Sequence, residues 1–473
     1  MHIRDYKFYI TSVATGIALG VIIALVPGYI AFFALVALTM FILKRYVKND
    51  DDFKFLISAI TVSILIRFIC VIVLETFLIK NNMLIKVFGY QTPDMFGDSG
   101  YYSLRSWWMA QSWMGNPLPN DVAKEIALKE YGHHGYLYFL ASIYYFFGFN
   151  TILSKLFTSF FGILLSVNVF FIAKHISGNV LTRKIAFILT AFWPTLLLWS
   201  MTSLKDIPIV FFYSLLILAI FKFLRMRLSE KKDYLALGLI FFIIAIAIFL
   251  RRILNILFIL PFFVALVMRF RFVRRIAMAG CVILIIYAFF NPNLMLAFKT
   301  WINERVVIFH KGSIITGGNT VKIFADKYYL FISGVPGGYY YYVSLPELIK
   351  GSLKGVPLPL IQPLPHRMGL NMTRRMALSG LMGAWYIALI AAIGGCVKLL
   401  VSGPRRKEVV ILILAILSTS LSIMLTTGNI GAIMRWRSLI EPFVLIFTAQ
   451  FLADNYSKFS KSAIVSFFTR RHR

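Results

Sequence analysis

Cysteine and the motifs of soluble enzymes are scarce in this chain of 473 residues. Its three cysteines, Cys70, Cys281 and Cys396, all fall inside apolar runs, which excludes a disulfide framework and a cysteine-rich metal site. The sequence contains no glycine-rich phosphate loop with a lysine and no HExxH zinc motif. It also lacks an internal repeat of the kind that many transporters show. These absences exclude the common soluble enzyme classes and disfavour a transporter built from repeats.

Acidic residues are also few: 19 Asp and Glu stand against 49 Lys and Arg, a formal net charge of +30. In a soluble protein this excess would suggest a nucleic-acid partner. Here most basic residues lie in short segments between apolar runs, which is the distribution that sets membrane topology. We therefore expect no nucleic-acid partner.

Hydrophobic residues make up 59% of the chain, and its mean hydropathy is +0.80. Soluble proteins are only about half apolar. Runs such as 234–250 and 409–424 carry no charge and have roughly the length that crosses a hydrocarbon core of about 30 Å. No alternating barrel pattern is present, so helices are the expected spans. The predicted fold class is all-α, a polytopic membrane protein.

The basic clusters predict about twelve crossings with both termini in the cytoplasm. Arg4 and Lys7 precede the first apolar run, and a tight turn at Pro27-Gly28 leads into the second. This second run and the lack of a small-residue cleavage site argue against a removed signal peptide. The predicted spans are residues 8–26, 28–43, 55–79, 156–173, 185–200, 207–224, 234–250, 253–268, 276–290, 376–397, 409–427 and 439–453.

Residues 136–149 are apolar but number only about fourteen, which is short for a crossing. We expect an interfacial or half-buried helix, because a crossing there would place every later basic cluster outside. Another interfacial helix is expected in the preceding outer loop, where Tyr101, Leu104 and Trp108 recur at helical spacing. Arg105 is expected among the polar members of that helix.

This topology divides the chain into four segments. They are residues 1–54, an N-terminal transmembrane hairpin with a cytoplasmic linker; 55–290, a core with a first outer loop at 80–135; 291–375, an extracytoplasmic loop; and 376–473, the C-terminal helices and a basic tail. The loop at 291–375 is rich in glycine, tyrosine and proline. A loop this long without obvious structure of its own is typically functional.

Two carboxylates, Asp94 and Asp98, lie immediately outside a hydrophobic span in the first outer loop. Ionisable groups beside the membrane are costly to place there and are therefore candidates for function. A carboxylate at this position can take a proton from an attacking hydroxyl. Asp98 is the expected reaction centre, with helix N-capping as the alternative role of both residues.

Basic side chains gather on the same predicted side of the membrane. Arginine forks fit phosphate oxygens and can stabilise a departing phosphate, which implies a lipid substrate that carries one. Alternatively, Lys205, Arg251 and Arg252 bind lipid headgroups. Within the span 55–79, Glu75 is near enough to the outer end to reach the site, whereas the deeper Arg67 is expected to hold helices together. The expected substrate-binding residues are Asp94, Tyr101, Lys205, Arg251, Arg252, Arg367, Arg435 and Arg437.

Several short motifs resemble the GT-C superfamily of integral membrane glycosyltransferases. They are Gly-Asp98-Ser-Gly-Tyr-Tyr, the Gly-Phe-Asn turn that leads to Lys155, the run from Pro194 to Asp206, and Arg435-Trp436-Arg437 followed by Glu441-Pro442. The last of these is similar to a motif that opens the final span of many members. The chain is most similar to bacterial members related to protein mannosyltransferases and aminoarabinose transferases, over residues 55–455.

The resemblance implies a sugar donor on a polyprenyl phosphate and an acceptor held outside the membrane. It implies that Asp98 is the general base, that Asp206 helps to hold a metal or the acceptor, and that Arg435 and Arg437 bind phosphate. The family often has a second acidic residue where this chain has Ser99. We therefore expect no certain cofactor, with a divalent cation as the alternative.

The predicted function is a glycosyltransferase of the bacterial cytoplasmic membrane, inverting, with Asp98 and Asp206 as catalytic residues. Its partners would be the polyprenyl-phosphate-linked sugar, an extracytoplasmic lipid, glycan or protein acceptor, and membrane lipids, as in cell-envelope polysaccharide biosynthesis. One alternative is an O-antigen or capsule polymerase or ligase that uses a polyprenyl-diphosphate oligosaccharide. An alternative of another class is a lipid or polysaccharide transporter, with Arg67 and Glu75 along its pathway.

Overall fold

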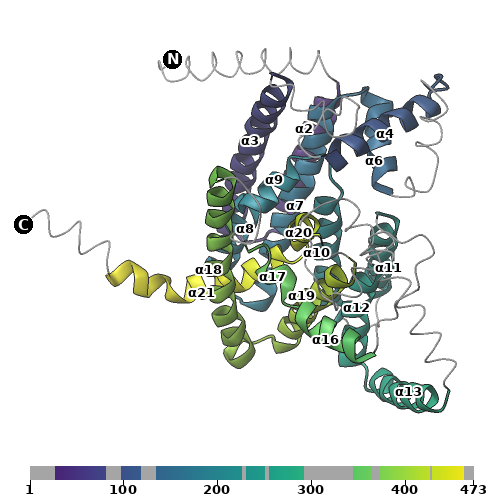
Figure 1. Ribbon diagram of the computed structural model, residues 1–473. Coiled ribbons are helices and arrows are strands. Elements are labelled where there is room, and N and C mark those ends of the chain that lie inside the picture. Colours follow the sequence, from purple (N-terminus) through teal and green to yellow (C-terminus); the bar gives the residue numbers. More distant parts are fainter. Residues whose placement is uncertain are drawn as a thin grey trace, which may run out of the picture. The chain divides into compact units, whose positions relative to one another are not determined.

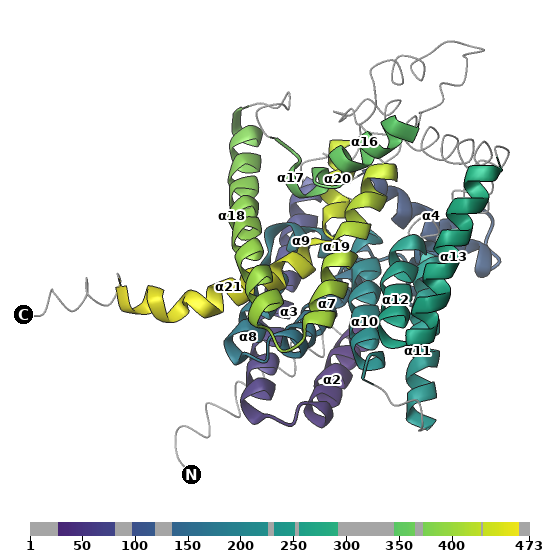
Figure 2. The ribbon, with the colours of Figure 1, turned by 90° about the horizontal axis from the view of Figure 1, so that it is seen from below.

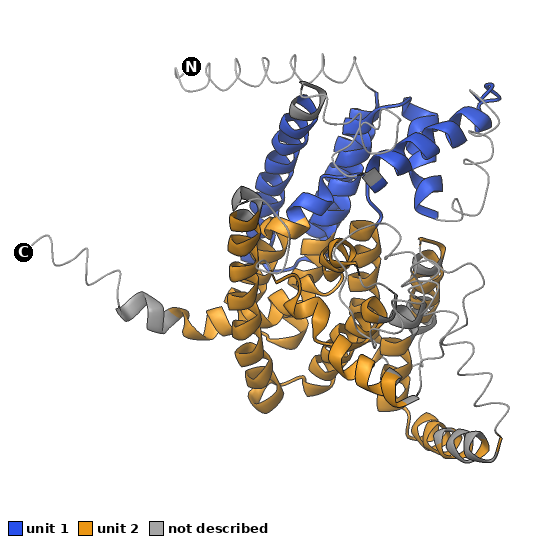
Figure 3. Ribbon diagram, in the orientation of Figure 1, with its two compact units in different colours: residues 1–164, 197–205 blue, residues 165–196, 206–473 orange. Residues whose placement is uncertain are grey.

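The described part of the chain is helical. The computed structural model describes residues 27–80, 97–118, 135–225, 231–250, 255–291, 345–364, 372–426 and 429–462. These residues form helices joined by turns and short connections, with no β-sheet among them (Figure 1). The predicted all-α class is therefore confirmed for this part of the chain. The helices fall into two compact units, residues 1–164 with 197–205 and residues 165–196 with 206–473 (Figure 3).

The first unit is built on α6 and the beginning of α7. Its helices are α2 (Gly28–Tyr46), α3 (Asp50–Lys80), α4 (Gly97–Trp113), α6 (Gly135–Phe147) and the first part of α7 (Thr151–Ile176). Leu140, Tyr144 and Leu153 are fully buried in its core. The Tyr144 hydroxyl donates a hydrogen bond to Ser154 Oγ at 3.2 Å, which satisfies the polar end of a buried ring.

The second unit contains the remaining helices. They are the rest of α7, α8 (Val180–Phe192), the start of α9 (Pro194–Ser200), α10 (Asp206–Phe223), α11 (Lys231–Leu250), α12 (Asn255–Arg269), α13 (Arg271–Phe290), α16 (Leu345–Gly355), α17 (Leu358–Ile361), α18 (Met372–Ser402), α19 (Arg406–Thr426), α20 (Ile430–Arg437) and α21 (Glu441–Ser462). Figures 1 and 2 both show α21 crossing α18. Gly395 of α18 permits this close approach, because a Cβ there would lie 1.9 Å from the Phe447 carbonyl oxygen.

Six helices of the described part are long and apolar enough to cross a membrane, which supports the predicted membrane-protein class. They are Gly28–Tyr46, Asp50–Thr76, Thr151–Ile176, Asp206–Phe223, Leu378–Ser402 and Arg406–Met424. The count becomes seven if α8 and α9 together form one broken span. The first predicted span, 8–26, lies outside the described residues.

Two predicted elements of intermediate length have different outcomes. Helix α6 has 13 residues, so the prediction that it is short for a crossing is confirmed. The predicted span 185–200 is not one straight helix, because α8 and α9 meet at a bend of 55°. Pro194 explains the break, since it has no N–H to continue the helix and it forces the preceding residue out of the helical region. Trp193 accordingly has φ −62° and ψ 125°.

Helix α4 forms where an interfacial helix was predicted, but it packs through a different face. The predicted apolar members Tyr101, Leu104 and Trp108 are only half-buried. The buried face carries Ser99, Ser103, Ser106 and Ala110 instead, and α4 packs on α6. Small side chains allow the helices to approach closely, and aromatic pairs such as Tyr102 with Tyr136 add to the contact. Arg105, expected among the polar members of this helix, is only 1% exposed.

The compact units also differ from the four predicted segments. The predicted boundary at residue 54 falls inside α3, which begins at Asp50. The observed boundaries fall inside α7, inside α9 and between Lys205 and Asp206. A hydropathy pattern identifies spans but does not say which spans share a core, so it carries no information about this division.

Candidate functional site

In the first unit, Asp98 lies in the first turn of α4 with its side chain exposed. A carboxylate is favoured here because it complements the positive end of the helix dipole. This placement fits the capping alternative and also leaves the carboxylate accessible to a substrate. Asp94, its predicted neighbour, lies outside the described residues.

The residues that follow Asp98 are held by the segment 197–205. Ser203 donates its backbone N–H to Ser99 Oγ at 2.9 Å, and Ser203 Oγ lies 3.0 Å from Ser154 Oγ on α7. Ser99 therefore links α4 to this segment. The first turn of α4 is thus tied to this segment by a hydrogen bond.

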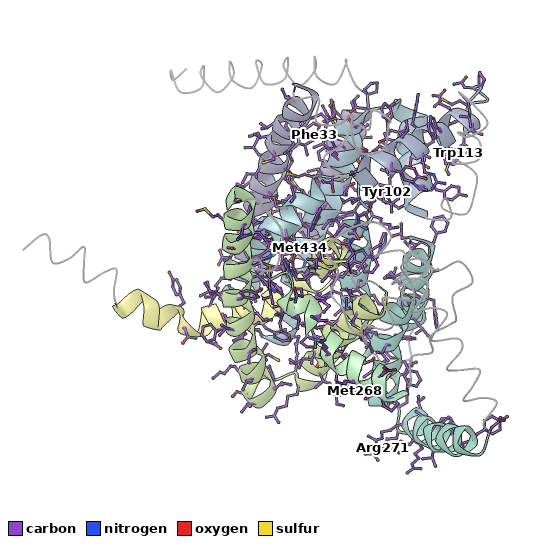
Figure 4. The ribbon with its side chains drawn as sticks, viewed as in Figure 1. Phe33, Tyr102, Trp113, Met268, Arg271 and Met434 are labelled. Carbon is purple, nitrogen blue, oxygen red and sulfur yellow. The ribbon has the colours of Figure 1, made fainter. Side chains whose placement is uncertain are left out.

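Two predicted substrate-binding residues, Tyr101 and Lys205, each take part in a cation–π contact in this region. The Lys205 ammonium lies 5.1 Å from the ring centroid of Tyr102, a residue of α4 that Figure 4 labels. Lys205 is only 4% exposed, so this contact accompanies desolvation and is worth more than a surface one. The Arg105 guanidinium lies 5.2 Å from the ring centroid of Tyr101.

The charges at membrane depth in α3 each have a polar partner. Glu75 Oε2 forms an ion pair with Lys155 Nζ at 2.5 Å, and Thr151 Oγ1 donates a hydrogen bond to Glu75 Oε1. Arg67 Nε donates to Ser200 Oγ at 3.1 Å. The prediction that Arg67 holds helices together is confirmed by this bond. Glu75 also has a partner, Lys155, because an isolated charge in a membrane helix has a high free-energy cost.

In the second unit, the predicted residues Asp206 and Arg435 form an ion pair. Asp206 begins α10, and its Oδ2 lies 3.2 Å from Arg435 Nε on α20. Asn429 caps α20 by accepting hydrogen bonds from the backbone N–H groups of Gly431 and Ala432, so the short helix has a fixed start. The Asp206 side chain is 1% exposed and that of Arg435 is 16% exposed. Part of the Arg435 side chain therefore stays accessible while its partner carboxylate is buried.

Arg437 has a different environment. It is fully buried and pairs with Glu441 at 3.0 Å through Nε, while Nη1 donates to the Gln362 carbonyl at 3.1 Å. Its guanidinium carbon lies 4.9 Å from the centroid of the Trp385 ring. Glu441 also accepts a hydrogen bond from Thr195 Oγ1 at 2.6 Å. These contacts make Arg437 the centre of a buried polar network.

The two arginines of α20 cannot act as one fork. Residues two apart on an α-helix project about 200° from each other. Arg435 accordingly faces Asp206 and Arg437 faces Glu441. Of the two, only Arg435 keeps part of its side chain accessible.

Three other predicted binding residues, Arg251, Arg252 and Arg367, lie outside the described residues. Within the described ranges, no three His, Cys, Asp or Glu side chains gather as a metal site. Asp206, the predicted metal or acceptor ligand, has an arginine as its partner.

Sequence reasoning did not single out Thr195, Gln362 or Trp385. Glu441 carried a usable signal, because it follows Arg437 by four residues, the spacing at which opposite charges meet on a helix. The other three carry no such signal, since tertiary packing brings Thr195 to Glu441, and Gln362 and Trp385 to Arg437, from distant segments.

No family model matches the chain, and neither a curated protein nor a solved structure matches it. The resemblance to GT-C enzymes therefore rests on the short sequence motifs.

Proposed function

We propose that the chain is a membrane glycosyltransferase that transfers a sugar from a polyprenyl phosphate to an extracytoplasmic acceptor. The acceptor hydroxyl oxygen attacks the anomeric carbon, and the bond from that carbon to the phosphate oxygen breaks. Asp98 takes the hydroxyl proton, and polyprenyl phosphate leaves. A single displacement inverts the anomeric centre.

The Asp206–Arg435 pair carries the proposal. The buried carboxylate lies 3.2 Å from the guanidinium, and a cation held at a fixed place by an opposite charge can stabilise a departing phosphate. Partial exposure of Arg435 leaves a surface that a phosphate can reach. Asp206 acts in this proposal by positioning Arg435.

Arg437 supports the proposed site indirectly. Its partners are Glu441 and a backbone carbonyl, and its side chain is fully buried. We assign it the role of fixing the end of α20, and with it the position of Arg435. Direct binding of phosphate by Arg437 would require it to leave this network.

Substitution of Asp98 tests the proposal. Purified wild-type protein should consume a polyprenyl-phosphate sugar from a panel of such donors, with a membrane extract as acceptor. Asp98→Asn should lower the rate about 10²- to 10⁴-fold, the usual contribution of a general base. Mass spectrometry of the donor and product measures the rate and identifies the sugar.

A matched control is Asp51→Asn, because Asp51 is also an exposed carboxylate in the first turn of a helix. This variant should retain the wild-type rate. If neither wild type nor variants consume any donor, the monophosphate-donor proposal fails. If Asp98→Asn and wild type are equally active, Asp98 is a cap and not the base.

The polymerase or ligase alternative depends more on arginine than on Asp98. Arg435→Lys keeps the charge opposite Asp206 but removes the planar fork that binds phosphate at two points. A ligase using diphosphate-linked oligosaccharide would lose activity in Arg435→Lys and keep it in Asp98→Asn. The glycosyltransferase should lose activity in both.

The proposal includes the GT-C-like arrangement and the twelve crossings. It also includes a location in the bacterial cytoplasmic membrane, with the site facing outward and both termini in the cytoplasm. It requires no cofactor, and it is compatible with a divalent cation at the site.

A further inference from the structure

A shallow surface cavity of about 500 Å³, widely open to its surroundings, lies in the second unit. It is lined by the end of α10 and by the turn between α18 and α19, which Figure 2 shows joining these two helices. The lining residues are Arg225, Gly403, Pro404, Arg405, Arg406, Lys407 and Glu408.

The lining of this cavity is strongly basic. Four cationic side chains, those of Arg225, Arg405, Arg406 and Lys407, face one carboxylate, that of Glu408, which gives a formal net charge of +3. The Glu408 carboxylate is engaged, because its Oε1 lies 2.6 Å from Arg225 Nη2. The carboxylate therefore compensates only part of the positive charge.

Two of the cations are fixed in position. Arg405 Nη1 donates a hydrogen bond to the His175 carbonyl oxygen near the end of α7 and lies 3.2 Å from His175 Nδ1. Arg406 Nη2 donates to the Val401 carbonyl oxygen. Burial and the positive charge of Arg225 lower the pKa of Arg405, while Glu408 opposes the shift. The cations thus lie close enough to repel one another.

We propose that this cavity binds the phosphate group of an anionic phospholipid. Arginine and lysine at such close spacing bind phosphate through charge-assisted hydrogen bonds. The cavity lies where the membrane-crossing helices α10, α18 and α19 end or begin, the level at which lipid headgroups are found. A bound phosphate relieves the repulsion among the cations.

Binding of lipid to the purified full-length protein, measured by native mass spectrometry, tests the proposal. The probes are phosphatidylglycerol, neutral phosphatidylcholine, and glycerol 3-phosphate as a soluble source of the same phosphate chemistry. Arg406→Gln/Lys407→Gln should raise the Kd for phosphatidylglycerol about tenfold, which corresponds to about 1.4 kcal/mol. Phosphatidylcholine should bind more weakly and equally to both proteins.

A matched control removes two adjacent exposed charges elsewhere in the same unit. Arg274→Gln/Arg275→Gln lies on α13, whose first residue, Arg271, is labelled in Figure 4, and should leave the Kd within twofold of wild type. Glu408→Gln provides a test of opposite sign. It removes the one carboxylate from the lining and should lower the Kd for phosphatidylglycerol.

Several results would overturn the proposal. Equal weakening by both double variants would mean general attraction to a basic surface. Weakening by Glu408→Gln as well as by Arg406→Gln/Lys407→Gln would mean that the substitutions act through loss of structure. Competition by glycerol 3-phosphate as effective as that of the lipid would make the ligand a soluble phosphate. Equal affinity for phosphatidylcholine and phosphatidylglycerol would show that the net negative charge of the headgroup does not determine binding.

Discussion

Buried ion pairs are costly to break, and the pair of Arg437 with Glu441 is an example. Both side chains are fully buried, whereas the pair of Lys54 with Asp50 has the same four-residue spacing and is largely exposed. Removing one partner of a buried pair leaves an uncompensated charge without water. Removing one partner of an exposed pair leaves a charge that water still solvates.

We therefore expect Arg437→Met to lower the free energy of unfolding by about 3–5 kcal/mol. Lys54→Met should leave the melting temperature nearly unchanged. The double variant Arg437→Met/Glu441→Gln should recover most of the loss, because no buried charge is left alone. Thermal unfolding in detergent measures all three, and a double variant as unstable as Arg437→Met would contradict the explanation.

At this scale, the sequence predicted that charges at membrane depth matter but not which partner each would find. Arg67 and Glu75 were recognised because they interrupt an apolar run. Their partners, Ser200 and Lys155, are 133 and 80 residues away. No local pattern connects residues at such separations, so only the folded chain identifies them.

At the scale of elements, the break between α8 and α9 turns Thr195 toward Glu441. Thr195 follows Pro194 directly and donates its hydroxyl to the Glu441 carboxylate. The hydropathy pattern indicates an apolar run in this region but does not register the single proline that divides it. The Pro194 ring favours the start of a new helix, since its φ is already helical and its missing N–H is not needed there.

We expect Pro194 and Thr195 to be coupled. Thr195→Val should cost about 2 kcal/mol in the wild-type background, because it removes a hydrogen bond to a carboxylate. In Pro194→Ala the cost should be smaller, since the helix can continue and the hydroxyl is no longer directed at Glu441. Thermal unfolding of the four proteins measures the coupling. Pro208→Ala, in the first turn of α10, is the control and should be additive with Thr195→Val.

At the scale of the whole molecule, charge distribution predicts which ends of the spans share a side. The turn at Lys48 and the turn at Ser402 are predicted to be cytoplasmic, and Asn116 is predicted to be outside. All three side chains are exposed. The described helices support the membrane class, and the sidedness remains a prediction of the sequence.

Single cysteines test the sidedness. The native cysteines number three, so a cysteine-free background is practical. Asn116→Cys should react with a membrane-impermeant maleimide in intact cells. Lys48→Cys and Ser402→Cys should react only after the membrane is opened. Identical labelling of Lys48→Cys and Asn116→Cys would show that the predicted topology is wrong.

The bond from Arg67 to Ser200 also has a consequence for biogenesis. The ribosome delivers Arg67 133 residues before Ser200, and the first unit is completed only when residues 197–205 arrive. Residues 165–196, which belong to the other unit, are synthesised in between. During this interval the guanidinium has Ser63 on its own helix as a hydrogen-bond partner. The insertion machinery therefore handles α3 with its buried charge before the partner that completes its site exists.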